Sequence, residues 1–160
     1  LSWKAREYDF ATRFIELAGE INTAMPYSVV SSVTDALNER GKSLKGSRVL
    51  VLGVAYKKDV DDLRESPTLK IMQLLIQRGA QVDYNDPYFP QLHKMRHYDY
   101  AHMKSKDLDP KTVGAYDCVI IATDHTSYDY PAIVQAAKLV IDTRNATRRI
   151  TGHRDKIVLC

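Results

Sequence analysis

The sequence predicts an α/β fold, a Rossmann-like doubly wound parallel sheet preceded by a long helical segment. From residue 48 onward, apolar runs of strand length alternate with segments of helical periodicity, as in right-handed βαβ units. The residues before 45 show helical periodicity alone. A chain of 160 residues is long enough to bury a core without disulfides or metals.

The first 44 residues contain one amphipathic stripe. Apolar side chains recur at helical spacing from Phe14 to Leu37, and the pattern stops at Gly41. Pro26 either starts a second helix or kinks a continuous one, because it lacks the amide hydrogen that an interior turn requires. The stripe must be covered by the following domain, by another subunit or by a missing N-terminal part. Because the chain opens without methionine and with a helical pattern, we expect Leu1 to lie inside a longer natural chain.

Four strands and two helices are predicted in the rest of the chain. The run "RVLVLGVAY" at 48–56 is typical of a strand that is buried on both faces. Ser66 and Pro67 predict the N-cap and first turn of a helix that ends at Gly79. The other strands are predicted at 80–87, 116–124 and 138–145, with a short helix at 130–137 and mostly irregular structure at 88–116.

Composition excludes several classes of function. A net charge of +3 is too slight to indicate binding to nucleic acid or to a membrane surface. No apolar run approaches the ~20 residues that span a bilayer. Cys118 and Cys160 are too few for a disulfide framework or a zinc site, and the histidines lack metal-ligand spacing. We therefore expect a protein of the reducing cytoplasm without a metal.

The segment "GVAYKKDVDDLRESP" follows the first strand, where sheets of this kind bind ligands. A dinucleotide fingerprint requires G-x-G-x-x-G, and only Gly53 is present, which disfavours NAD binding by this turn. Lys57, Lys58 and Arg64 can instead hold phosphate groups. Alternatively, these cations pair with the neighbouring acidic residues on a solvated loop, and composition alone favours this second interpretation.

Three motifs resemble a known family. "GVAYKKDVDDLRESP", "VDYNDPY" and "IDTRN" are similar to the C-terminal, nucleotide-sugar-binding domain of the UDP-glucose/GDP-mannose dehydrogenase family. "LSWKAREYDFATRFIELAGEINTAMP" resembles the central helical region of the same enzymes. The resemblance is greatest to the branch that oxidises C6 of UDP-N-acetylhexosamines, the UDP-N-acetylglucosamine 6-dehydrogenases in particular. It places residues 1–44 at the end of a helical dimerisation region and residues 45–160 in the UDP-sugar-binding domain.

The resemblance implies a full-length enzyme with NAD as its cofactor and a homodimer formed through the helical segment. Such enzymes convert a primary alcohol to a carboxylate by two successive hydride transfers to NAD, through intermediates bound to a cysteine. This chain starts after the loop that carries the cysteine. We therefore expect it to bind the UDP-sugar, to contain no catalytic residue and to be inactive alone.

The resemblance also assigns binding residues. Tyr56 and Lys57 match an aromatic residue and a lysine that contact the nucleotide-sugar, and Arg144 matches an arginine with the same role. Arg64, in the Arg-Glu-Ser motif, matches an arginine that reaches the NAD.

The remaining polar residues near the strand ends receive structural interpretations. Asp59, Asp61 and Asp62 are expected to fix the basic side chains or to cap the turn. Asp86 is followed by Pro87, which favours a turn. His125 could line the cleft, but is interpreted as an ordinary loop histidine.

Three classes of function therefore stand side by side. The chain is the UDP-sugar-binding part of a dehydrogenase, a self-sufficient NAD-binding protein, or an assembly module whose charged turn is only solvated. Titration with UDP separates the first class from the third, and titration with NAD tests the second.

Overall fold

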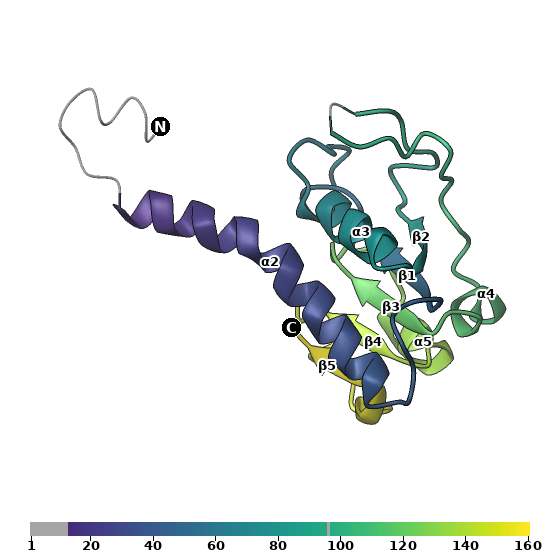
Figure 1. The fold of residues 1–160 in the computed structure, drawn as a ribbon. Helices are drawn as coiled ribbons and strands as arrows, with labels where there is room; N and C mark the ends of the chain where they lie inside the picture. The colour runs from purple at the N-terminus through teal and green to yellow at the C-terminus, as the bar shows by residue number, and fades with distance from the viewer. Residues whose placement is uncertain (1–12, 96) are drawn as a thin grey trace, which may run out of the picture.

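A computed structural model describes residues 13–95 and 97–160, which form a five-stranded parallel sheet with helices on both faces (Figure 1). The strand order is β2-β1-β3-β4-β5, and every neighbouring pair is parallel. This arrangement confirms the predicted doubly wound sheet. The strands are β1 Arg48–Leu52, β2 Gln81–Asn85, β3 Cys118–Ile121, β4 Val140–Asp142 and β5 Ile157–Leu159.

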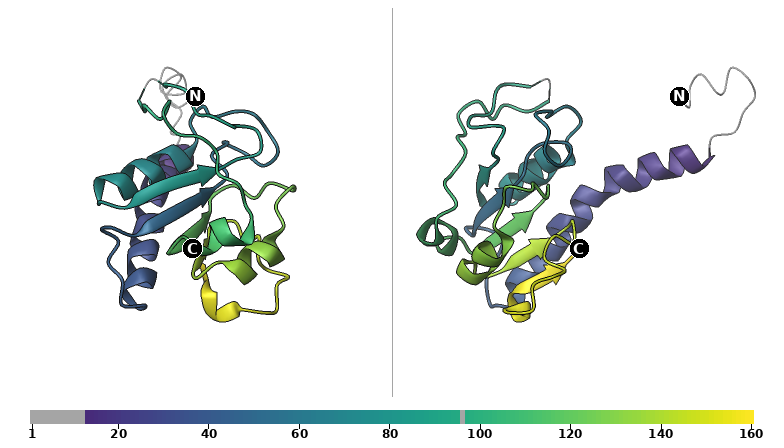
Figure 2. Two further views of the ribbon diagram at one scale, coloured as in Figure 1. Left: turned by 90° about the vertical axis from the view of Figure 1, so that its right-hand side faces the viewer. Right: turned by 180° about the vertical axis from the view of Figure 1, so that it is seen from behind.

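The helices form one layer on each face of the sheet (Figure 2). Helix α3 (Pro67–Gln77) packs with the second half of α2 (Arg13–Asn38) on one face, and α4 (Pro110–Gly114) packs with α5 (Tyr130–Ala136) on the other. Side chains of β1 alternate between the two layers: Val49 and Val51 belong to the α2/α3 core, and Leu50 and Leu52 to the α4/α5 core. A central strand covered on both faces requires the continuous apolar run that the sequence shows.

The prediction missed three elements: β5, α4 and the 3₁₀ helix η1 (Arg154–Lys156). Strand β5 is a run of only three apolar residues at the partly exposed edge of the sheet, which is too short to predict a strand from the sequence. Helix α4 lies within the segment predicted to be mostly irregular. The carboxylate of Asp109 accepts hydrogen bonds from the amides of Lys111 and Thr112, and Pro110 occupies the first turn.

The N-cap prediction for α3 is only partly right. Ser66 occupies the N-cap position, but its hydroxyl makes no capping hydrogen bond. The hydroxyl is buried without a hydrogen-bond partner in the described part of the chain. Pro67 at the first helical position therefore starts the helix, through its fixed φ and its missing amide hydrogen.

Helix α2 runs continuously through Pro26 and bends about midway (Figure 1), so the proline kinks one helix and does not start a second. Its second half is buried in the core from Val29 to Leu37. The following domain therefore covers that half of the apolar stripe. The helix predicted before residue 13 lies outside the described residues.

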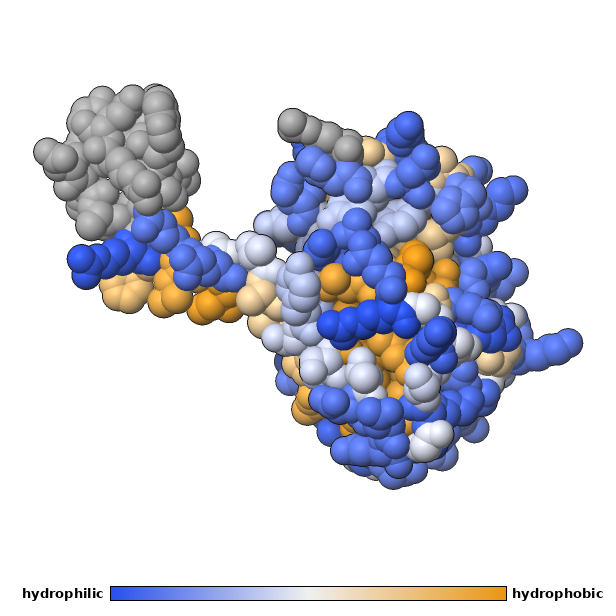
Figure 3. Space-filling model, viewed as in Figure 1, coloured by the Kyte–Doolittle hydropathy of each residue, from blue (hydrophilic) through white to orange (hydrophobic). Residues whose placement is uncertain are grey.

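The first half of α2 projects away from the sheet, and apolar side chains gather along it (Figure 3). Phe14 is 89% exposed. The other large apolar residues exposed on this half are Ile15, Leu17, Ile21 and Met25. Among residues 13–95 and 97–160, no helix is both long and apolar enough to cross a bilayer.

Candidate functional site

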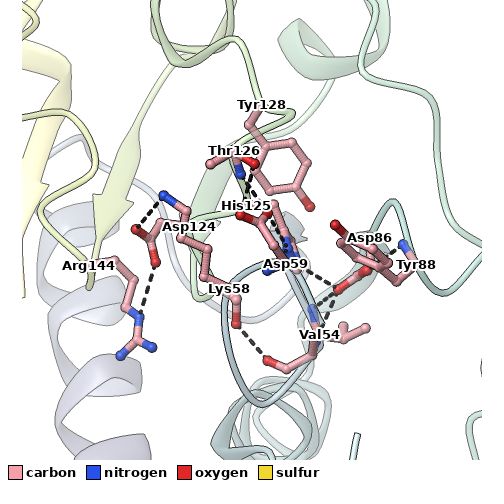
Figure 4. A network of polar contacts seen from close by, with 12 residues as sticks. Val54, Lys58, Asp59, Asp86, Tyr88, Asp124, His125, Thr126, Tyr128 and Arg144 are labelled. Atoms are coloured by element: carbon pink, nitrogen blue, oxygen red, sulfur yellow. Dashed lines mark hydrogen bonds and ion pairs between the residues drawn. The ribbon is translucent and has the colours of Figure 1, made fainter. Parts of the chain in front are cut away.

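The turns after β1, β3 and β4 meet at the carboxyl edge of the sheet (Figure 4). Strands β1 and β3 are neighbours, but the chain leaves β1 to form β2 on one side and returns to form β3 on the other. This is a topological switch point, where open α/β sheets bind ligands. The predicted ligand residues all lie in the turns after β1 and β4.

Gly53 lets the turns after β1 and β3 approach each other closely. Its φ is +81°, and a Cβ at this position would lie 2.5 Å from both the Cβ and the carbonyl oxygen of Thr123. The Thr123 hydroxyl donates to the carbonyl of Ala55 at 2.8 Å. Thr123 thus fills the space beside Gly53, whereas a dinucleotide fingerprint would leave backbone amides open to a pyrophosphate.

Asp86 joins the end of β2 to the turn after β1. Its residue is 2% exposed, and its Oδ2 accepts hydrogen bonds from the amides of Val54 at 2.7 Å and Ala55 at 3.0 Å. Its Oδ1 accepts from the amide of Tyr88 at 2.9 Å, in the turn that the sequence predicted. The carboxylate therefore links the end of β2 to the turn after β1.

His125 is not an ordinary loop histidine, because it is fully buried. Its Nε2 lies 3.1 Å from Oδ2 of Asp86, and its Nδ1 accepts a hydrogen bond from the amide of Asp59 at 3.0 Å. The rings of Tyr88 and Tyr128 pack around it, with centroids 5.2 and 5.5 Å away. Its position just after a strand was the only sequence signal of this role.

The structural roles predicted for Asp59 and Asp62 are confirmed. Asp59 has a positive φ of 58°, and its carboxylate accepts from the amide and the hydroxyl of Thr126 at 2.9 and 2.8 Å. The backbone hydrogen bond from Thr126 is the main cause that lowers the pKa of Asp59. Asp62 accepts from the amide, Nε and Nη2 of Arg64, and these contacts, the side-chain one foremost, lower its pKa to about 2. Asp61 forms no side-chain hydrogen bond or ion pair with the residues that the structure describes.

Tyr56 and Lys57 are exposed at the point where the turn leaves the core. The side chains lie together, with Nζ of Lys57 5.5 Å from the centroid of the Tyr56 ring. Lys57 has no carboxylate within ion-pair distance among the described residues. Its charge is therefore available to a ligand.

Asp124, which follows β3, joins the turn after β1 to the turn after β4. Its carboxylate lies 3.9 Å from Nζ of Lys58 and 3.8 Å from Nε of Arg144. The two terminal nitrogens of Arg144 point away from Asp124 (Figure 4). They can form the bidentate fork that suits a phosphate group. The sequence did not reveal Asp124 or the link between Lys58 and Arg144, because the three residues come from separate turns.

The backbone around Arg144 is fixed by Asp142, which is 1% exposed. Its carboxylate accepts from the amide of Arg144 at 3.0 Å, and from the amide and hydroxyl of Thr147 at 2.8 and 2.7 Å. A buried aspartate at a strand end thus organises each of the two turns that carry predicted ligand residues: Asp86 for the first and Asp142 for the second.

Arg64 lies in a different setting. Its side chain is 87% exposed and pairs with Asp62 at 2.9 Å within the same turn. The solvated-loop interpretation therefore describes Arg64, but not Lys58, whose partner lies in another turn. Within the described ranges, no cluster of three or more His, Cys, Asp or Glu residues could hold a metal ion.

Comparison with known proteins gives consistent matches. Residues 50–149 match the UDP-glucose/GDP-mannose dehydrogenase family, UDP binding domain. The chain is 30% identical over 151 residues to UDP-N-acetyl-D-mannosamine dehydrogenase of Methanococcus maripaludis strain C7, covering 89% of this chain and 33% of that protein. It is 28% identical over 128 residues to UDP-N-acetyl-D-glucosamine 6-dehydrogenase of Pseudomonas aeruginosa, covering 80% of this chain and 29% of that protein.

A solved structure shows the same fold. UDP-glucose dehydrogenase from Pyrobaculum islandicum superimposes with a TM-score of 0.69 and 25% identity, covering 99% of this chain and 34% of that one. The chain thus spans about a third of the length of the curated relatives it matches.

Proposed function

Since the chain belongs to the UDP-glucose/GDP-mannose dehydrogenase family, we propose that it is the UDP-sugar-binding part of an NAD-dependent UDP-sugar 6-dehydrogenase. The observation that carries the proposal is the pair of preorganised basic turns at the switch point of the sheet. Each is held by a buried aspartate, and each presents a cation with donors free for a ligand. A turn whose backbone is already fixed binds without the entropic cost of ordering that backbone.

The chemistry of a UDP-sugar suits these turns. Its diphosphate carries negative charge, which the unpaired Lys57 attracts and the fork of Arg144 binds with two parallel hydrogen bonds. Tyr56 is 43% exposed beside Lys57 and offers an aromatic face to the nucleotide-sugar. We propose that these three residues contact the ligand and that Asp124 orients Arg144 from behind.

The residues of this sheet do not fit NAD. Thr123 fills the space beside Gly53, and the turn after β1 lacks the further glycines of a dinucleotide site. We propose that the cofactor is bound by another domain of a longer enzyme and that the exposed Arg64 reaches it from this one. NAD would accept the hydride there. The self-sufficient NAD-binding protein is the less favoured alternative for the same reason.

Neither cysteine suits nucleophilic catalysis. Cys118 is fully buried in β3, and burial raises the pKa of its thiol. The thiol of Cys160 is exposed and lies 3.3 Å from the hydroxyl of Ser32 on α2, not in the turns of the site. We therefore propose that this chain contributes binding, but no catalysis, to a cytoplasmic enzyme.

For the sugar we propose a group of substrates, and for the partner a second copy of the chain. The matched relatives act, by name, on UDP-N-acetylmannosamine, UDP-N-acetylglucosamine and UDP-glucose, so the proposed substrate is a UDP-hexose of this group. The exposed apolar half of α2 favours a homodimer formed through this helix. If the chain self-associates but binds no UDP, the assembly module becomes the better interpretation.

Isothermal titration calorimetry of the chain with UDP tests the proposal. Lys57→Ala or Arg144→Ala should remove a charge-assisted contact worth roughly 1.5–3 kcal/mol, about ten- to a hundredfold in affinity. Lys138→Ala is the matched control. Its Nζ lies 3.7 Å from Asp117 and its side chain is 53% exposed, close to the 3.8 Å and 43% of Arg144, but it lies at the amino edge of the sheet.

Lys58 itself is a poor control, because it shares Asp124 with Arg144. Because Lys138 lies at the opposite edge of the sheet from the two turns, Lys138→Ala should leave the affinity for UDP unchanged, and the loss of its exposed ion pair should cost only about 0–1 kcal/mol of stability. Equal and small effects at Lys57, Arg144 and Lys138 would refute the binding role of the two turns.

A further inference from the structure

We propose that His125 is a positioning residue for the turn that carries Tyr56 and Lys57. The inference rests on the function proposed above, because it concerns how that turn is presented to the UDP-sugar. His125 has no exposed surface, so it cannot touch a ligand itself. Its effect must pass through the residues that it holds.

The hydrogen bonds assign one form of the ring. The amide of Asp59 can only donate, so Nδ1 of His125 must accept, at 3.0 Å. The hydrogen of a neutral ring then lies on Nε2, which points at Oδ2 of Asp86 at 3.1 Å. A hydrogen on Nδ1 would face the amide of Asp59, donor against donor, and the Asp59 carboxylate, 3.6 Å from Nδ1, already accepts two hydrogen bonds from Thr126. The geometry therefore selects the neutral Nε2–H tautomer.

With this tautomer, Asp86 and His125 hold both ends of the turn, an arrangement that we call the clamp. At the first end, the amides of Val54 and Ala55 donate to Oδ2 of Asp86. At the second end, the amide of Asp59 donates to His125, which donates in turn to the same oxygen. One buried carboxylate oxygen thus fixes the distance between the two ends, as Figure 4 shows.

The exposed residues lie between the clamped ends. Val54 and Ala55 are buried, residues 56–58 are exposed, and Asp59 is half-buried where it contacts His125. The positive φ of Asp59, 58°, is unusual for a residue other than glycine and is held by the contacts to His125 and Thr126. Loss of the clamp would let the turn relax and would raise the cost of ordering Lys57 on the ligand.

The first experiment uses no ligand. In ¹⁵N-labelled protein, the imidazole correlations of His125 should show the neutral Nε2–H form. His125→Asn places a carbonyl oxygen where Nδ1 lies, and should keep the amide of Asp59 protected from hydrogen exchange. His125→Gln places an amide nitrogen where Nε2 lies, keeps the contact with Asp86, and should speed exchange at Asp59. Equal protection of Asp59 in both variants, or an Nδ1–H ring, would overturn the proposal.

The second experiment measures the affinity for UDP by calorimetry, well below the unfolding temperature of each variant. His125→Gln should weaken binding about tenfold through the released turn. The double variant Lys57→Ala/His125→Gln should lose clearly less affinity than the sum of the two single losses, because the histidine acts largely through Lys57. Unchanged affinity in His125→Gln, or additive losses in the double variant, would show a role in stability only and would overturn the positioning role.

The two proposals fail in different ways. If the unaltered chain binds no UDP, the proposed function is wrong, while the tautomer and the exchange at Asp59 still decide whether the clamp exists. If UDP binds and depends on Lys57 but not on His125, the function stands and the positioning role is refuted.

Discussion

Gly53→Ala is the change that most directly tests how the turns of the site are packed. An alanine here must adopt a φ near +81°, which costs about 1–2 kcal/mol for a residue with a Cβ. The new methyl would lie 2.5 Å from the carbonyl oxygen of Thr123, where van der Waals contact needs well over 3 Å, so the backbone must move. Overpacking of this kind costs about 1–3 kcal/mol, which gives a total loss of about 2–5 kcal/mol.

Gly46→Ala separates the two contributions. Its φ is +84°, almost that of Gly53, but no atom lies within 4 Å of the position of its Cβ. It should lose only the conformational part, about 1–2 kcal/mol. Alanine also lowers the conformational entropy of the unfolded chain, which stabilises both variants by about 0.4–1 kcal/mol. This contribution cancels when the two variants are compared.

Urea denaturation of the two variants and the unaltered chain measures the free energies of unfolding. We expect Gly53→Ala to be less stable than Gly46→Ala by about 1–3 kcal/mol, the cost of the contact with Thr123. If Gly53→Ala were as stable as Gly46→Ala, the turn after β3 would move away from the new methyl group at no cost in free energy. The close packing of the two turns would then not be what holds the site.

Three further predictions concern activity, titration and assembly. The purified chain should reduce no NAD with UDP-N-acetylglucosamine or UDP-glucose, and robust turnover that is abolished by replacing Cys118 or Cys160 would contradict this. Arg64→Ala should raise the pKa of Asp62 from about 2 part of the way toward its ordinary value of 3.8 in an NMR titration of the carboxyl carbon, because the side-chain hydrogen bonds from Arg64 are lost while the amide of residue 64 still donates. Because the pKa of Asp62 is lowered in the folded chain, ionised Asp62 contributes its full stabilisation of the fold above pH 3.8, and this contribution disappears as the pH falls toward 2. An unchanged pKa of Asp62 in Arg64→Ala would show that Arg64 does not contact Asp62 in solution. The exposed apolar half of α2 should cause self-association in sedimentation, reduced by Phe14→Asp, whereas a strict monomer that binds no hydrophobic dye would refute the predicted interface.

The sequence predicts the elements whose signals are local. Strands β1 and β3 are buried on both faces, and therefore appear as continuous apolar runs. Strand β5 could not be predicted in this way, because its three residues lie at a half-buried edge and are defined mainly by pairing with β4. The fold class follows from the strands and helices that do leave such signals.

The site is predictable only as far as residue types reveal it. Lys57 and Arg144 stand out as cations after strands, and the structure leaves both with donors free. The contact of Asp124 with Lys58 and Arg144, and the burial of His125, depend on which turns the topology brings together. Asp59 and His125 are 66 residues apart in sequence, and a backbone amide leaves no trace in the sequence pattern.

The central claim is that the turns after β1 and β4 bind the diphosphate of a UDP-sugar. Its most direct test is a titration of the ¹⁵N-labelled chain with UDP, followed by amide chemical shifts. We expect saturable changes at residues 55–58 and 143–146, and none at the amino edge of the sheet around Lys42 and Asp117, which form an ion pair there. Changes confined to that amino edge, or no change at millimolar UDP, would contradict the claim.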